Sequence, residues 1–132
     1  MVFNVGAFSS NLRNEVARSK KYYFYDLGIR NGLVGQYHTL DSRSDIGALW
    51  ENFLIVERLK KLEYAKDLVS HYFWRAYNKA EIDWIEQTSQ GMQAFEFKWK
   101  EPQVYRTPKS FNEKYGLDAS PISKENYLRF IL

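Results

Sequence analysis

Three strand-like segments separated by short turns constrain the fold of this chain more than any other feature. They cover residues 71–77, 80–87 and 92–100 and are rich in aromatic and branched side chains. Asn78-Lys79 separates the first pair, and Thr88-Ser89-Gln90-Gly91 separates the second. Both connections have the length and composition of hairpin turns. The pattern therefore predicts a three-stranded antiparallel meander.

A long apolar helix is predicted before this meander, over residues 45–63. Nearly every position from Ile46 to Val56 is apolar, so we expect the helix to be buried over a wide arc against the sheet. Ser42 and Asp45 form an approximate capping box at its start.

A second helix and a last strand are predicted after the meander. Thr107-Pro108 is typical of a helix start, with threonine at the N-cap and proline in the first helical position, and Gly116 marks the end. A short strand over residues 121–123 and a terminal helical turn follow. Helices on the faces of a mixed sheet define the α/β class that we expect for residues 45–132.

Residues 1–44 are interpreted as an N-terminal extension of that core. A helix is expected to begin near Ser10, followed by an aromatic strand over residues 22–25. Asp26 can cap a brief helix that Gly35 ends, and residues 36–44 form a polar connector.

Composition limits the classes of function. The chain has 132 residues, which suits a single domain, and 45% of them are hydrophobic. The net charge of +3 permits a polyanionic partner, whereas the lack of cysteine excludes disulfides, thiolate zinc sites and cysteine nucleophiles. No apolar run approaches the ~18 residues of a membrane span, and no signal-peptide pattern is present, so we expect a cytoplasmic protein without membrane contact.

Asp83 and the tripeptide Glu96-Phe97-Lys98 carry the chemistry that the sequence suggests. Strand alternation places Glu96 and Lys98 on one face, with Phe97 and its aromatic neighbours on the core face. Hairpin pairing can bring Asp83 beside Glu96, and two carboxylates suit a hard cation such as Mg²⁺ or Mn²⁺. Lys98 could then orient or deprotonate an attacking water. An amphipathic strand with a solvated charge pair is the alternative.

Glu51 is a candidate third acid because it interrupts the apolar run of the long helix. A lone glutamate is costly to bury unless it is paired or binds a metal. The alternative is an ordinary ion pair with Arg75 or Arg58.

Arg75 and Lys100 are candidate nucleic-acid contacts, although structural pairing of Arg75 and a solvated location for Lys100 also explain them. The four tryptophans are best explained as core or interface anchors.

The order of these residues resembles the PD-(D/E)xK superfamily of restriction-endonuclease-like nucleases. The runs KYYFYDLGIRNGL, GALWENFLIVERLK, YFWR, EIDWIE and EFKWK more closely resemble the C-terminal uncharacterised domain of prokaryotic AAA+-type ATPases. The superfamily's proline is absent, since Ile82 precedes Asp83.

The resemblance implies a restriction-endonuclease-like core linked to an upstream ATPase and a winged-helix segment. This sequence contains no P-loop motif, so we do not expect it to bind ATP in that way. The implied activity is Mg²⁺-dependent phosphodiester hydrolysis with DNA as partner, Asp83 and Glu96 as metal ligands, and Lys98 and Glu51 as further catalytic residues. The alternative is an inactive module that binds DNA or protein, or regulates the ATPase. The residues predict no particular oligomeric state.

Overall fold

The computed structural model describes residues 1–9 and 19–132. The helix expected near Ser10 lies outside these residues. In chain order the elements are β1 (Val2–Gly6), β2 (Lys20–Phe24), α1 (Leu27–Val34), the 3-10 turn η2 (Leu40–Ser42), α2 (Ile46–Ala65), β3 (Ser70–Arg75), β4 (Glu81–Thr88), β5 (Gly91–Phe97), α3 (Lys109–Tyr115), β6 (Ala119–Ile122) and α4 (Leu128–Ile131).

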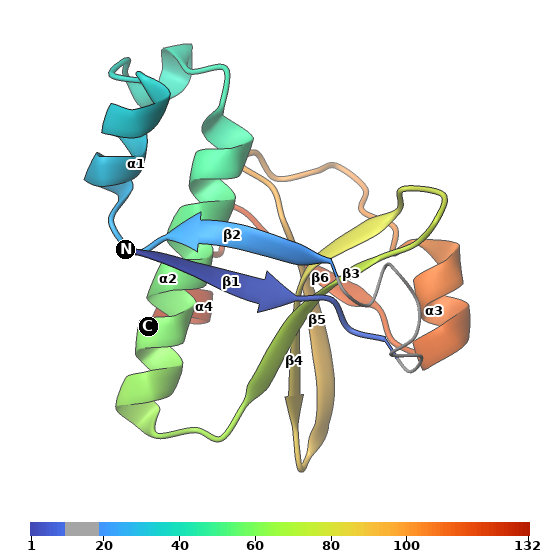
Figure 1. The fold of residues 1–132 in the computed structure, drawn as a ribbon. Coiled ribbons are helices and arrows are strands. Elements are labelled where there is room, and N and C mark those ends of the chain that lie inside the picture. The colour runs from blue at the N-terminus through green and yellow to red at the C-terminus, as the bar shows by residue number, and fades with distance from the viewer. Residues whose placement is uncertain (10–18) are drawn as a thin grey trace.

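The main sheet has four strands in the order β3-β4-β5-β6. Its first three strands form the predicted antiparallel meander, and β6 pairs with β5 in parallel, so the sheet is mixed. In Figure 1, α2 and α4 lie on one side of this sheet and α3 lies on the other. The predicted α/β class is therefore confirmed.

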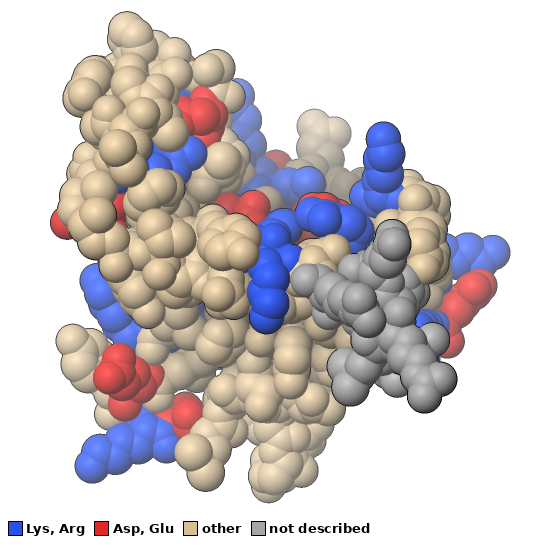
Figure 2. Space-filling view, viewed as in Figure 1, with Lys and Arg blue, Asp and Glu red and all other residues tan. Residues whose placement is uncertain are grey.

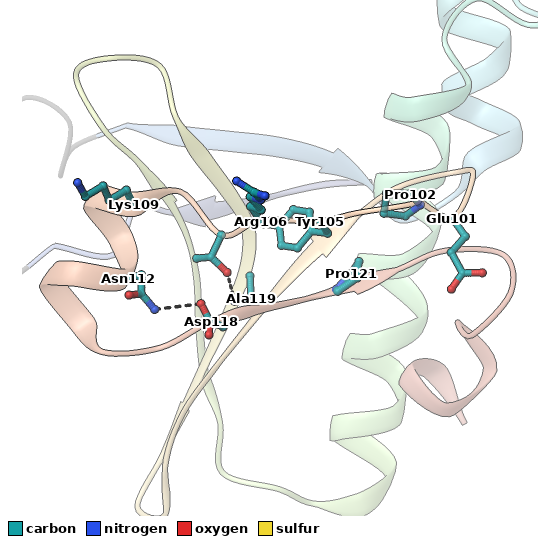
Figure 3. A pocket seen from close by; sticks show the side chains of 10 residues that line it. Glu101, Pro102, Tyr105, Arg106, Lys109, Asn112, Asp118, Ala119 and Pro121 are labelled. Atoms are coloured by element: carbon teal, nitrogen blue, oxygen red, sulfur yellow. Dashed lines mark hydrogen bonds between the residues drawn. The ribbon is translucent and has the colours of Figure 1, made fainter.

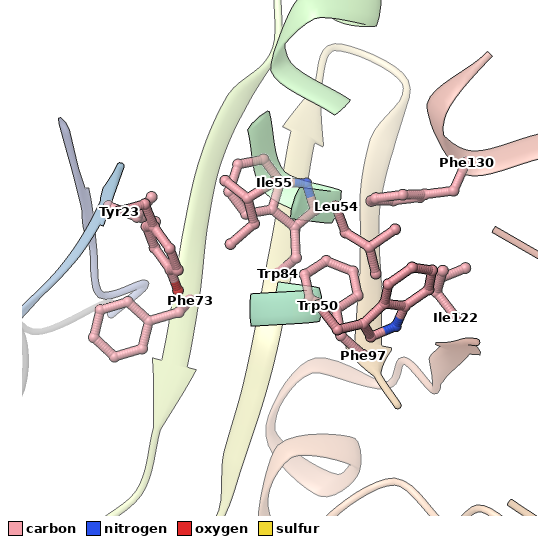
Figure 4. Close-up of a cluster of buried hydrophobic side chains, with 10 residues drawn as sticks. Tyr23, Trp50, Leu54, Ile55, Phe73, Trp84, Phe97, Ile122 and Phe130 are labelled. Carbon is pink, nitrogen blue, oxygen red and sulfur yellow. The ribbon is translucent and has the colours of Figure 1, made fainter. Parts of the chain in front are cut away.

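Two clusters of buried side chains fill the two sides of the sheet. On the α2 side, Trp84 and Phe73 from the sheet meet Leu54 and Ile55 from α2, as Figure 4 shows. On the α3 side, Phe111 packs with Trp74, Ile82, Ile85, Ala94 and Ala119. Trp50, Trp74 and Trp84 are buried and Trp99 packs against the α2-side cluster, which confirms that the tryptophans anchor the core.

A β-bulge interrupts β4 beside β3. Tyr72 pairs with Ile85 and Trp74 pairs with Ile82, so Asp83 and Trp84 together stand opposite a single residue of β3. Ile82 and Ile85 consequently both belong to the α3-side cluster, although they are three positions apart. A regular strand would turn such residues to opposite faces.

The β1–β2 hairpin contributes to the same core as the sheet. Val5 and Tyr23 are buried in the α2-side cluster, and the Phe8 amide donates to the Phe73 carbonyl at 2.7 Å. Strand β1 was not predicted from the sequence. The segment interpreted as an extension therefore packs as part of the folded unit.

Local signals set the ends of α1 as predicted. The Asp26 carboxylate accepts a hydrogen bond from the Ile29 amide at 3.0 Å, which caps the helix N-terminus. Gly35 ends the helix in the left-handed region with φ of 69°, a conformation that glycine adopts without steric cost.

Two other predicted caps are wrong. Asp45 precedes α2 but makes no side-chain cap; its carboxylate instead binds Arg30 at 2.9 Å and Arg43 at 2.8 Å. This pairing removes the oxygens that a capping box would use. Thr107 does not cap α3, because its hydroxyl accepts the Ala119 amide at 2.9 Å and Pro108 takes the N-cap position.

Across the described part of the chain, no helix combines the length and the apolar character that crossing a membrane requires.

Candidate functional site

Asp83 and Glu96 lie next to each other on β4 and β5. The Asp83 Oδ2 atom accepts the Phe97 amide at 2.8 Å, a bond that ties the carboxylate to the neighbouring strand. Asp83 is 8% exposed, and the Glu96 side chain is 13% exposed. The hairpin thus brings together the two carboxylates paired in the sequence analysis, with Asp83 buried and Glu96 largely buried.

Burial makes this carboxylate pair difficult to ionise. Burial, followed by the negative charges of Glu51 and Glu96, raises the pKa of Asp83 to about 8. Burial also raises the pKa of Glu96, against the opposing effects of Lys98 and of hydrogen bonding to Asp83. A cation near these oxygens would favour their charged forms.

Lys98 lies on the same side of β5 as Glu96, as predicted. Its Nζ is 3.5 Å from Glu96 Oε1, and its side chain is half-exposed. The second oxygen of Glu96, Oε2, is buried and has no hydrogen-bond partner among the residues that the structure describes. A buried polar atom in this state is unusual and marks a place where a further group can bind.

Lys21 is a site residue that the sequence analysis missed. Its Nζ lies 3.1 Å from Glu51 Oε1, 3.6 Å from Glu81 Oε2 and 3.9 Å from Asp83 Oδ1. The residue comes from β2, far from the other site residues in the sequence. Its alternation with Tyr23, which puts both on one face of an aromatic strand, was the available signal. In Figure 2 charged side chains of both signs gather near the start of β2.

Glu51 is bound by this hairpin and by neither arginine considered for it. Its Oε1 accepts from Lys21 Nζ and from the Tyr23 hydroxyl at 2.5 Å. Burial, followed by the charge of Glu51, raises the pKa of Tyr23, so the phenol remains a donor. The predicted pairing of Glu51 with Arg75 or Arg58 is wrong, because these side chains have other partners.

Arg75 pairs with Glu81, whose Oε1 lies 2.5 Å from Arg75 Nε. This is the structural pairing that we weighed against a substrate contact. Lys100 is exposed on the loop after β5, and the structure does not bring it into the carboxylate cluster.

Two of the carboxylate oxygens are candidates for binding a divalent cation. Asp83 Oδ1 and Glu96 Oε2 are oxygens of the type that Mg²⁺ prefers, and Mg²⁺ commonly uses only one or two carboxylates. Asp83 Oδ1 is 3.9 Å from Lys21 Nζ, and Glu96 Oε2 lacks a partner in the described part of the chain. Within residues 1–9 and 19–132, no cluster of three or more His, Asp or Glu side chains is suitable for holding a metal. Asp83 and Glu96 therefore offer two carboxylates of the type that Mg²⁺ uses, and Glu51 does not join them in a three-residue group among the described residues.

A cleft of about 640 Å³ opens beside β6, the strand paired with Glu96. Tyr105, Arg106 and Lys109 line it, together with Glu101, Pro102, Thr107, Asn112, Asp118, Ala119 and Pro121. Figure 3 shows Arg106 and Lys109 on the same side of the cleft. The Tyr105 hydroxyl is buried without a partner among the described residues, and the charges of Glu96 and Asp83 contribute, after burial, to its raised pKa. Tyr105 therefore lines the cleft and is influenced by the charges of both carboxylates.

A family model described as a domain of unknown function, DUF4143, matches residues 46–128. No curated protein and no solved structure matches the chain. The matched range includes Glu51, Asp83, Glu96 and Lys98, and it leaves out the β1–β2 hairpin that supplies Lys21.

Proposed function

This chain belongs to the DUF4143 family, and we propose that it is a nuclease-like domain that hydrolyses phosphodiester bonds with the help of Mg²⁺ or Mn²⁺. One observation carries the proposal: Asp83 is buried beside the largely buried Glu96, and the Lys98 ammonium lies 3.5 Å from Glu96. Buried acids with raised pKa values beside a half-exposed lysine are typical of reactive sites.

Each side chain has a role in this proposal. Asp83 and Glu96 would hold the cation through Oδ1 and Oε2, while the Phe97 amide keeps Asp83 in its orientation. When bound, the cation supplies charge neutralisation at the phosphate and lowers the pKa of the attacking water. Lys98 is exposed enough to reach that water or a phosphate oxygen, which it would orient or stabilise.

DNA is the proposed substrate. The cleft beside β6 offers Arg106 and Lys109 for phosphate contacts, next to Tyr105. The order of a helix, a meander, a helix and a strand around the site supports a restriction-endonuclease-like core. We further propose that an upstream AAA+-type ATPase part works with this domain, as the sequence resemblance implies.

A nuclease assay with Mg²⁺ or Mn²⁺ tests the proposal on single-stranded DNA, double-stranded DNA and RNA. We expect metal-dependent cleavage by the parent protein and its loss in Asp83→Asn and Glu96→Gln, which preserve side-chain shape. Asp41→Asn is the matched control, because Asp41 is exposed on η2 away from the site. Equal cleavage by the parent and Asp83→Asn, or cleavage without metal, would overturn the proposal.

A catalytically inactive module that binds DNA or protein is the second candidate. The contact of Lys21 with Glu51, Glu81 and Asp83 favours it, because these acids already have an internal cation. This candidate predicts DNA binding without cleavage, unchanged by Asp83→Asn and weakened by Arg106→Ala with Lys109→Ala. Fluorescence anisotropy with labelled DNA distinguishes it from the nuclease.

A further inference from the structure

We propose that Lys21 is an internal counter-cation of the carboxylate cluster, and that its ammonium must leave Asp83 before a divalent cation can bind there. The inference rests on the proposed metal site and adds a regulatory element from the β1–β2 hairpin. The family match does not include that hairpin.

The Lys21 ammonium is placed among several carboxylates. Lys21 reaches from β2 over the Phe73 ring, with its Nζ 5.3 Å from the ring centroid, and its side chain is 18% exposed. From there the Nζ contacts carboxylates from α2 and from β4. A lysine ammonium can donate three hydrogen bonds, so several acids can share it.

The two carboxylate oxygens of Asp83 differ in their availability to a metal ion. Asp83 Oδ2 already accepts the Phe97 amide at 2.8 Å, so Oδ1 is the oxygen with more of its lone-pair capacity left for a cation. That same Oδ1 faces Lys21 Nζ at 3.9 Å. A divalent ion bound to Oδ1 would lie against the ammonium, and two cations this close repel each other strongly in a half-buried site.

Lys21 is held mainly by Glu51. Its strongest contact is to Glu51, which also accepts the Tyr23 hydroxyl from the same strand. Lys21 can therefore turn away from Asp83 and still keep its bond to Glu51. Glu51 would then act as the acceptor that retains the lysine, and this is a different role from the third catalytic acid suggested by the sequence.

Metal binding to Lys21→Met tests the inference, since methionine keeps much of the length of the side chain and removes the charge. We expect Mn²⁺, measured by calorimetry, to bind this variant about tenfold more tightly than it binds the parent, because a unit charge next to the ligand is removed. Lys20→Met is the matched control: it removes the same charge from an exposed neighbour on β2 and should leave the affinity close to that of the parent. Lys21→Arg, which keeps the charge, should bind no more tightly than the parent.

The outcomes separate the inference from the proposed function. If the parent binds Mn²⁺ and Lys21→Met binds it equally or more weakly, the counter-cation role is wrong while the metal site stands. If neither binds Mn²⁺, both are wrong. If Lys21→Met does not fold, as judged by circular dichroism, ¹⁵N-lysine spectra of the parent decide: Mg²⁺ must shift the Lys21 Nζ signal and leave that of Lys20 in place, and an unmoved Lys21 signal overturns the inference.

Discussion

Two clusters of charged side chains lie against β4, and they differ in how completely their charges are satisfied. In the first, the Arg58 cluster, Arg58 binds Glu86 through two nitrogens at 2.6 and 2.7 Å and donates to the Phe130 carbonyl at 2.7 Å. Trp84 Nε1 adds a hydrogen bond to Glu86 at 2.9 Å. This cluster joins α2, β4 and the C-terminal segment and leaves neither oxygen of Glu86 without a donor.

The second, the Lys21 cluster, contains Glu51, Glu81, Asp83 and Glu96 with Lys21, Arg75 and Lys98. Acids outnumber cations, one glutamate oxygen has no partner in the described part of the chain, and the pKa of Asp83 is raised to about 8. Buried ion pairs with complete hydrogen bonding hold elements together, whereas a crowded and incompletely satisfied cluster is typical of a site that binds something else. The contrast teaches that burial of charge alone does not distinguish structure from function.

The largest expected effect is on stability, from Glu86→Ala in the Arg58 cluster. This change leaves the Arg58 guanidinium largely buried without its carboxylate, and we expect the free energy of unfolding to fall by about 3–5 kcal/mol. Urea denaturation measures it. Glu57→Ala, at an exposed pair with Lys60, is the control and should cost about 0.5 kcal/mol or less. A loss of unfolding free energy in Glu86→Ala as small as in the control would show that the Arg58 cluster does not hold the elements together.

The free energy of unfolding should depend on pH through Asp83 in the Lys21 cluster. A carboxyl whose pKa is raised in the folded state favours folding below its unfolded pKa, and that contribution is lost as pH rises toward the folded value of about 8. We expect stability to fall by roughly 2–3 kcal/mol between pH 5 and pH 7 from this group. Asp83→Asn should remove that part of the slope, and the exposed Asp41→Asn should keep it. Denaturation at several pH values measures both.

The smallest stability effect is expected for Lys98→Ala. Its pair with Glu96 is 3.5 Å long and half-exposed, so the free energy of unfolding should change by about 0.5 kcal/mol or less. Nuclease activity, in contrast, should fall about a hundredfold or more if Lys98 assists the water attack. A large loss of stability with unchanged cleavage would reverse the assignment of the two clusters.

The sequence predicted those parts of the fold that local signals determine. Asp26 and Gly35 mark the ends of α1 by themselves, and the turns of the meander lie between adjacent strands. The pairing of Asp83 with Glu96 followed from a single hairpin. The side-chain partners of Asp45 and Thr107 could not be predicted. Arg30 and Ala119, which are distant in the sequence, bind the side-chain oxygens that a helix cap would use.

The candidate site was predicted only in part, for the same reason. Lys21 contacts Glu51, which lies 30 residues further along the chain, and no spacing rule relates the two. Strand β1 depends on its pairing with β2, from Val2 with Phe24 to Gly6 with Lys20, and five residues alone give a weak pattern. The Arg58–Glu86 pair also required the tertiary structure, since each residue alone resembles an ordinary surface charge.

The β-bulge at Asp83 and Trp84 makes this site sensitive to the length of the chain as well as to its side chains. Removing one residue there would give β3 and β4 a regular ladder and would turn either the acid or the indole to the opposite face of the sheet. The extra residue lets the strand direct an indole into the core and place a carboxylate beside Glu96 in consecutive positions. A one-residue deletion in β4 should therefore disrupt the fold and the site more than any point substitution in the Lys21 cluster. Homologous chains that keep this site should also keep the number of residues between the β3–β4 turn and Glu86.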